Sequence, residues 1–261
     1  MNDTPVKSAL ASHSSLNRAA CIISRLVMIA GISGSLNAWA QPAGFDAKTG
    51  TRGAVYPPHR LVDFTHMTLA ITIADMNTPK ALVKQTLAFT PISSEVGTLR
   101  LDAKGLKIDS VECVSAARPG SEAAKPAAAA FTHDGRVLSI TFDPPLAKGQ
   151  QSDLVIHYRI EDPKLGLVWT PESPAWPGRA AQLHTQGQPQ TNSYWFPCHD
   201  FPNERLSTEL IVTAPAGYEV SSNGKLIGRT KKILTSDDTA GRRDLLAHEE
   251  WHFLQEPPHV N

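Results

Sequence analysis

Apolar and polar residues alternate with a period of two along much of residues 66–213, as β-strands with one buried face require. The apolar members of this pattern are Met67, Leu69, Ile71, Ile73, Val83, Leu87, Phe89, Leu99, Leu101, Ile108, Val111, Leu138, Ile140, Phe142, Leu154, Ile156, Tyr158 and Ile160. Two later strands are expected at 206–213 and 218–222. The sequence therefore predicts an all-β fold.

Turn residues separate these runs. Asp134-Gly135 is a strong hairpin signal just before the strand at 138–142, and Asn223-Gly224 is a second tight turn. Pro144-Pro145 is expected to close the strand at 138–142. Short strands punctuated in this way favour an antiparallel sandwich or a curved pair of sheets. The strand–helix alternation of a nucleotide-binding α/β fold does not appear, and neither does an internal repeat.

Residues 162–204 lack this periodicity and contain seven prolines and three tryptophans. An irregular stretch of this length inside a compact domain is usually functional or packed over a sheet. It contains His184, Cys198, His199 and Asp200, which could ligate a metal, although their spacing matches no recognisable ligand pattern. A structural loop is the simpler interpretation.

The N-terminus resembles a secretory leader. Arg18 and Arg25 precede the short apolar run 26–32, and Ala38-Trp39-Ala40 is a small-x-small cleavage site. Residues 1–40 are therefore predicted to be a signal peptide, with a retained amphipathic N-terminus as the alternative, and the protein is expected to be exported to the periplasm or the extracellular space. No apolar run is long enough to span a membrane. Residues 41–60 are rich in Gly, Pro and polar residues and are expected to be a flexible lead-in.

Charge and cysteine content narrow the possible partners. The 25 basic and 25 acidic residues cancel, and the pI is about 7.2, so the chain has no charge that would favour nucleic acid. Cys113 and Cys198 follow the leader. One bridge between them is possible in an oxidising compartment, and two buried free thiols are equally compatible with the sequence.

One sequence motif suggests an active site directly. His248-Glu249-Glu250-Trp251-His252 is a literal H-E-x-x-H, which on a helix would place two imidazoles beside a zinc ion and Glu249 beside the metal-bound water. The third ligand that zinc needs is not evident, because the metzincin positions 255 and 258 hold Gln255 and Pro258. We interpret the motif as a chance match within a polar strand or helix end.

A second group of motifs carries a family resemblance. Thr185-Gln186-Gly187-Gln188, followed by Phe196-Pro197-Cys198-x-Asp200-x-Pro202, resembles the end of the N-terminal domain of the aminopeptidase N family, the zinc metallopeptidases that include leukotriene hydrolase. Further landmarks of that family are matched, in order, by Ala214-Pro215-Ala216-Gly217-Tyr218, Ser222-Asn223-Gly224, and Trp251-His252-Phe253 with Pro257. The resemblance covers roughly residues 60–261.

The resemblance implies a saddle-shaped, mostly antiparallel β domain over residues 61–261 that packs on a thermolysin-like catalytic domain. It also implies that Gln188, with Gln186 beside it, binds the free α-amino group of a peptide substrate. Most family members have glutamate at this position, so Gln188 removes one charge-assisted contact. The zinc site of the family would lie in the catalytic domain, which this chain is expected to lack, so no cofactor is expected here.

Three functions follow from these observations. The first is the substrate-amine-binding and scaffolding domain of an exported zinc metalloaminopeptidase, inactive alone. The second is a stand-alone β-sandwich module that binds peptides or a protein partner. The third is a minimal zinc hydrolase that uses His248 and His252. We favour the first.

Overall fold

The computed structural model describes residues 45–46, 51–52, 58–115, 126–237 and 243–260. The predicted signal peptide lies outside the described residues, as does most of the predicted lead-in. The chain divides into two units, Met1–Tyr56 and Pro57–Asn261. In the first unit, β1 (Phe45–Asp46) pairs antiparallel with β2 (Thr51–Arg52). None of the described residues form a helix that is long and apolar enough to cross a membrane.

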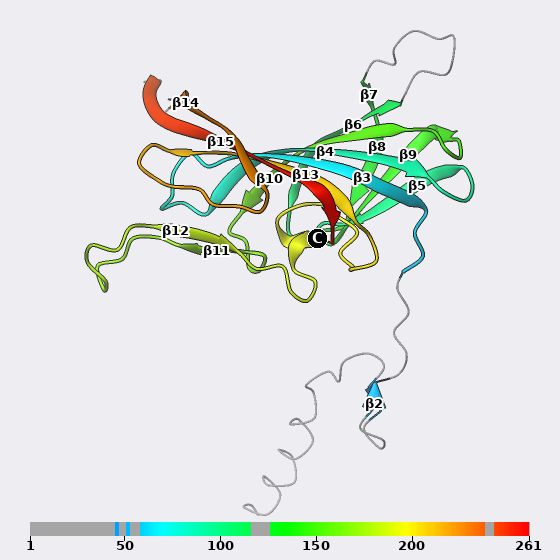
Figure 1. The fold of residues 1–261 in the computed structure, drawn as a ribbon, viewed down its shortest axis with the longest axis horizontal. Coiled ribbons are helices and arrows are strands. Elements are labelled where there is room, and N and C mark those ends of the chain that lie inside the picture. The colour runs from blue at the N-terminus through cyan, green and yellow to red at the C-terminus, as the bar shows by residue number, and fades with distance from the viewer. Residues whose placement is uncertain (1–44, 47–50, 53–57, 116–125, 238–242, 261) are drawn as a thin grey trace, which may run out of the picture. The chain divides into compact units, whose positions relative to one another are not determined.

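The second unit is built on an eight-stranded sheet with the order β14-β15-β13-β3-β4-β10-β6-β7 (Figure 1). Its strands are β3 (Val62–Thr72), β4 (Lys80–Pro91), β6 (Lys107–Ser115), β7 (Ala127–Ala128), β10 (Ser152–Glu161), β13 (Leu206–Pro215), β14 (Lys225–Asp237) and β15 (Arg243–His259). All neighbouring strands run antiparallel except β3 and β13, which are parallel. The predicted all-β, mostly antiparallel fold is confirmed.

Smaller elements complete this unit. A three-stranded sheet has the order β5-β9-β8, and a separate hairpin is formed by β11 and β12. Their bounds are β5 (Val96–Asp102), β8 (Ala130–His133), β9 (Val137–Leu146), β11 (Leu167–Thr170) and β12 (Gln182–Thr185), and a single 3-10 turn, η1, covers Asn192–Tyr194. The hairpin lies within the stretch that the sequence pattern left without periodicity.

The core lies between the large sheet and these smaller elements. Alternate residues of β3, β4 and β10 are buried, including Leu69, Phe89 and Ile156, and they pack with Leu101 and Ile140 of the three-stranded sheet. The predicted period-two pattern is therefore confirmed as the inner face of the sheets. Burial of these side chains stabilises each by about 1.5–3 kcal/mol relative to exposure.

Pro144 and Pro145 do not end their strand, contrary to the sequence prediction. β9 continues through both prolines to Leu146, which pairs with Val96. The register shifts between the pairs Thr98–Thr141 and Val96–Leu146, so the prolines occupy a bulge. Residues in a bulge make no regular ladder hydrogen bonds, so the missing proline N–H does not break the pairing.

The strand predicted at 218–222 is also wrong. β13 ends at Pro215, and residues 218–222 form an irregular segment before β14 begins at Lys225. Tyr218 and Val220 are partly buried against the core without pairing to another strand. The alternation in this segment reflects side-chain packing alone. The tight turn predicted at Asn223-Gly224 is present, with Gly224 at φ +85°.

Both cysteines of the second unit are free thiols, which resolves the two alternatives left by the sequence. Burial raises the pKa of the Cys198 thiol well above its ordinary value, and the carboxylates of Asp200 and Asp102 raise it further. Burial also raises the pKa of Cys113, and its contact with Ser115 opposes that rise. Both pKa shifts favour the protonated thiol, which reacts more slowly than the thiolate.

We expect Cys198 in the folded protein to resist alkylation by iodoacetamide at pH 8 and Cys113 to react slowly, because the thiolate is the reactive species. Mass spectrometry of the peptides that contain each cysteine would measure both rates. In guanidinium chloride the two rates should become equal. Rapid labelling of Cys198 under native conditions would contradict the structure.

Candidate functional site

The candidate site lies in the loop between β12 and β13, residues 186–205. The loop begins where the backbone N–H of Gln186 donates to Gly166 O, 2.8 Å away, next to the last pair of the β11–β12 hairpin. The backbone N–H of Thr191 donates to Gly187 O at 3.0 Å, and the Thr191 hydroxyl donates to Gln186 O. These bonds fold residues 186–191 into a compact turn that holds Gln186 and Gln188 on one short segment.

Two glycines permit this compact turn. A Cβ on Gly187 would lie 2.7 Å from Oδ1 of Asn192, so any side chain would displace the buried amide. Gly166 has φ +80°, and a Cβ there would lie 2.4 Å from Thr191 O, a main-chain atom that cannot move aside. Glycine is required at Gly166 because a backbone atom approaches it closely, whereas at Gly187 it leaves room for the Asn192 side chain.

Gln186 and Gln188 open onto a hollow of about 840 Å³. Its lining consists of Gln186, Gly187, Gln188, Pro189, Asn192, Asp200, Phe201, Pro202 and Val260. Both glutamine side chains are exposed, and within the described residues neither has a hydrogen-bond partner. Their amide groups are therefore available to a ligand. The carbonyl oxygens can accept from an ammonium group, and the amide nitrogens can donate to a peptide carbonyl.

Asp200 also lines this hollow. Its side chain is 7% exposed, and Oδ2 accepts from the backbone N–H and the hydroxyl of Ser193, at 3.2 and 2.7 Å. The structure therefore places a buried acidic residue in the same wall as the two neutral amides. The sequence had suggested Asp200 as a possible metal ligand, but it did not predict its position beside Gln188.

The rest of the loop is fixed to both sheets. Cys198 pairs with Asp102 through backbone bonds of 2.7 and 3.0 Å, which extends the three-stranded sheet. The hydroxyl of Tyr158 donates to Trp195 O at 3.0 Å, and Nε2 of the fully buried Gln85 donates to Pro197 O at 2.8 Å. Because these anchors come from three different strands, the loop has a defined conformation beneath the hollow.

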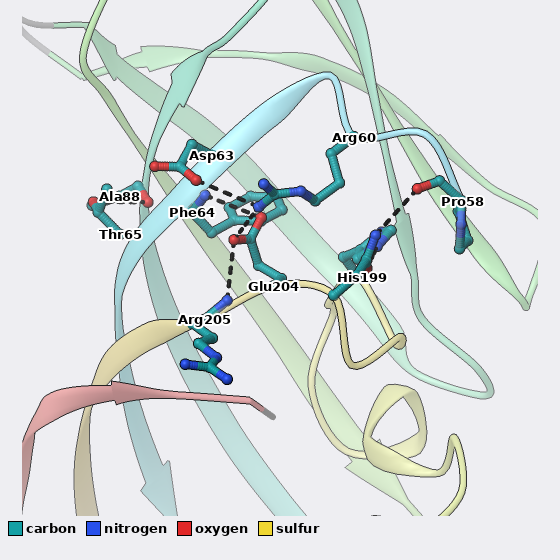
Figure 2. A network of polar contacts seen from close by, with 10 residues as sticks. Pro58, Arg60, Asp63, Phe64, Thr65, Ala88, His199, Glu204 and Arg205 are labelled. Atoms are coloured by element: carbon teal, nitrogen blue, oxygen red, sulfur yellow. Dashed lines mark hydrogen bonds and ion pairs between the residues drawn. The ribbon is translucent and has the colours of Figure 1, made fainter. Parts of the chain in front are cut away.

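An ion pair between the buried Glu204 and the half-buried Arg60 holds the other end of the loop (Figure 2). Glu204 is 3% exposed and accepts from the Arg60 guanidinium, from the Arg205 backbone N–H at 3.1 Å and from the Phe64 N–H at 3.4 Å. Asn203 also donates to Pro58 O at 3.3 Å. The last residues of the predicted lead-in are thus bound to the loop. Sequence reasoning missed Glu204, since no motif distinguishes it from an exposed loop glutamate.

An apolar groove of about 550 Å³ separates the β11–β12 hairpin from the inner face of the large sheet. Its apolar lining comes mainly from Ile71, Ile73, Met76, Leu167, Leu183, Trp195, Leu210, Val212, Tyr218 and Val220. Val168 of the hairpin and Trp176 at its tip are 40% and 65% exposed. The hairpin that leads to Gln186 therefore borders an apolar surface open to solvent.

His248 and His252 lie in β15, an extended strand, so their α-carbons are about 13 Å apart. The His248 ring contacts Ala74 O at 3.2 Å and Leu246 O at 3.1 Å, and it is buried. His252 contacts Glu209 at 3.2 Å, whereas Glu249 pairs with Arg229. A strand separates the two imidazoles that a helix would bring together, so this geometry does not provide a zinc pair.

The other histidines and acids do not assemble a metal site either. His199 donates from Nε2 to Asn203 Oδ1 at 2.7 Å, Asp200 binds Ser193, and His184 is exposed on β12. Over the ranges that the structure describes, no three His, Cys, Asp or Glu side chains come close enough to hold an ion. The described residues therefore do not fit zinc.

Comparison with known proteins identifies relatives of this chain. Residues 65–239 match the model of the peptidase M1 N-terminal domain. Human aminopeptidase B is 30% identical over an alignment of 129 residues, and the match covers 44% of this chain and 20% of that protein. The rat aminopeptidase B match covers 34% of this chain and 13% of that protein, at 29% identity. The chain thus spans a fifth or less of these curated relatives.

Solved structures share the fold. The M1 zinc metallopeptidase from Deinococcus radiodurans superposes with a TM-score of 0.56 at 20% identity, over 76% of this chain and 40% of that one. Leukotriene A4 hydrolase from Saccharomyces cerevisiae gives a TM-score of 0.52 at 15% identity, over 76% and 27%. These identities establish the fold, and the match to the family model covers two thirds of the chain. The chain belongs to the family of peptidase M1 N-terminal domains, as the motifs around Gln188 and Asp200 predicted.

Proposed function

We propose that this chain is the substrate-amine-binding and scaffolding domain of an exported zinc metalloaminopeptidase, which releases N-terminal amino acids from peptides. The observation that carries the proposal is the hollow beside Gln186 and Gln188, with Asp200 among the residues that line it. Export is proposed from the leader-like sequence at residues 1–40.

The hollow suits a primary ammonium group. A peptide N-terminus carries three N–H donors and one positive charge. The side-chain oxygens of Gln186 and Gln188 supply two acceptors, and Asp200 supplies the opposite charge at the wall. Asp200 is already bonded to Ser193, so its contribution is electrostatic, while Gln188 makes the direct contact.

The apolar groove is the proposed docking surface for a peptidase domain. It lies beside the hairpin whose end carries Gln186, so a domain seated there would meet the substrate's N-terminus at Gln188. The Deinococcus metallopeptidase, of which this chain covers 40%, has room for such a second domain. Zinc and the catalytic groups would belong to that domain, because the described residues here offer no fitting donor set.

Gln188 should determine recognition of the amine. We expect leucine amide to shift the backbone amide resonances of residues 186–191 in heteronuclear NMR spectra of the purified chain, and N-acetyl-leucine amide, which has no ammonium group, to leave them unshifted. Gln188→Glu should tighten binding of leucine amide by about tenfold, since a charged acceptor forms a stronger bond to ammonium than a neutral amide. Gln188→Ala should remove the shifts.

Gln190 provides the matched control. It is an exposed glutamine two residues further along the same loop and does not line the hollow. Gln190→Ala should bind leucine amide as the parent does. Equal shifts from the acetylated and free amines, or equal loss of binding in both alanine variants, would refute the proposed role of Gln188.

A further inference from the structure

β14 forms an open edge of the eight-stranded sheet. It stands first in the strand order, and within the described chain β15 is its one neighbour. From Gly228 to Asp237 the two strands pair without a register shift. A regular edge strand presents a second row of N–H and C=O groups to solvent, and another strand can bind to that row.

The distal part of this hairpin exposes apolar side chains. Ile233 is 69% exposed and pairs with Ala247, while Leu245 is 71% exposed and pairs with Thr235. Alternate residues of a strand share a face, so these four exposed side chains lie together on one face at the open edge. An exposed apolar face beside an unpaired strand marks a surface that binds another chain.

The charges on β14 determine what kind of chain fits. The strand carries Lys225, Arg229, Lys231 and Lys232 against the single acid Asp237. Glu249 and Glu219 neutralise Arg229, and Glu250 lies 3.2 Å from Lys232. Lys231 is opposite Glu249 in the ladder but makes no ion pair in the part of the chain that the structure covers. A second copy of β14 would bring more basic residues to the ladder, where like charges repel. An acidic strand would instead be attracted.

We propose that the edge of β14 between Gly228 and Thr235 is a strand-addition site for an extended peptide segment with the order apolar-apolar-acidic-acidic. In the antiparallel direction, the two apolar residues lie opposite Leu234 and Ile233 and the two acidic residues lie opposite Lys232 and Lys231. Main-chain bonds provide the affinity, and the cross-strand pairs provide the selectivity. None of these residues lines the hollow at Gln188, so the site is independent of the proposed amine recognition.

The probe is a fluorescein-labelled eight-residue peptide, Ser-Thr-Val-Val-Glu-Glu-Thr-Ser, titrated with the protein and followed by fluorescence anisotropy. We expect saturable binding. N-methylation at one alternating set of peptide amides should abolish binding, and N-methylation at the other set should leave it intact, since an edge strand bonds to one set only. This test requires no change in the protein.

The charge pattern is tested by reversal. The variant Lys231→Glu/Lys232→Glu should bind the acidic peptide at least about tenfold more weakly, and a Val-Val-Lys-Lys peptide should recover the affinity. The variant Lys84→Glu/Lys148→Glu changes two exposed lysines elsewhere and should bind as the parent does. The proposal is overturned by an absence of saturable binding or by tolerance of N-methylation in both patterns. It is equally overturned if affinity stays unchanged on charge reversal, or if the charge-reversed protein dimerises in place of binding peptide.

Discussion

Glu204→Ala is expected to lower the free energy of unfolding by about 3–4 kcal/mol, the largest effect of any single polar substitution that we propose. The substitution removes the acceptor for the Arg60 guanidinium and for the backbone N–H groups of Phe64 and Arg205. The Phe64 N–H is then left unpaired in a buried position, which itself costs about 1–3 kcal/mol. Urea denaturation followed by tryptophan fluorescence would measure the change.

Asp63 provides the matched control for the ion pair. Asp63 contacts the same guanidinium at 3.4 Å, but its side chain is 48% exposed. Asp63→Ala should therefore cost no more than about 1 kcal/mol. Phe64 N–H and Arg205 N–H bond to different carboxylate oxygens of Glu204, so Glu204→Gln keeps an acceptor for only one of them and loses the charge. Its effect should fall between the two. If Glu204→Ala and Asp63→Ala proved equally mild, the Arg60–Glu204 ion pair would not be holding residues 58–64 to the loop.

Gly166→Ala is expected to lower the free energy of unfolding by about 3 kcal/mol, because two costs combine. The alanine must adopt φ near +80°, which is unfavourable for a residue with a Cβ, and that Cβ would press on Thr191 O at 2.4 Å. Relief of the contact requires the turn of residues 186–191 to move. We therefore expect the NMR resonances of Gln186 and Gln188 to shift and the affinity for leucine amide to fall.

Gly178 separates strain from contact. It lies in the same hairpin at φ +81°, and a Cβ there would meet no atom within 4 Å. Gly178→Ala should cost about 1 kcal/mol through backbone strain alone and should leave leucine amide binding unchanged. If the two alanine variants were equally stable, the close approach between Gly166 and Thr191 would have no energetic consequence.

The strands and the family could be predicted from the sequence because both signals are local. Alternation from Met67 to Ile73 records which side chains face the core, and all four apolar residues of this run are buried in β3 or directly after it. The motifs around Gln188 and Asp200 identify a loop of the family from the order of its residues alone. The prediction failed where the alternation along the chain does not correspond to the pairing between strands. Residues 218–222 alternate but find no partner strand, and Pro144 and Pro145 are accommodated by a bulge that depends on β5.

Long-range contacts were not accessible from the sequence. Arg60 and Glu204 are 144 residues apart, and the isolated segments give no sign that they meet. The same holds for Gln85, which reaches Pro197 across 112 residues. Such contacts depend on how β3, β4 and the loop pack, so their energetic role appears only when the sheet is assembled.

The sequence by itself determined the strand-rich class, the order of the family motifs and the identity of Gln186 and Gln188 as candidate ligand contacts. The tertiary structure alone decided what surrounds them, namely the hollow, the buried Asp200 beside it and the ion pair at Glu204. It also decided the geometry of His248 and His252. The H-E-x-x-H motif is compatible with a helix or a strand. Its residues form a strand here because β15 pairs with both β13 and β14. Hydrogen bonding between distant segments selects one backbone conformation among those that the local sequence allows.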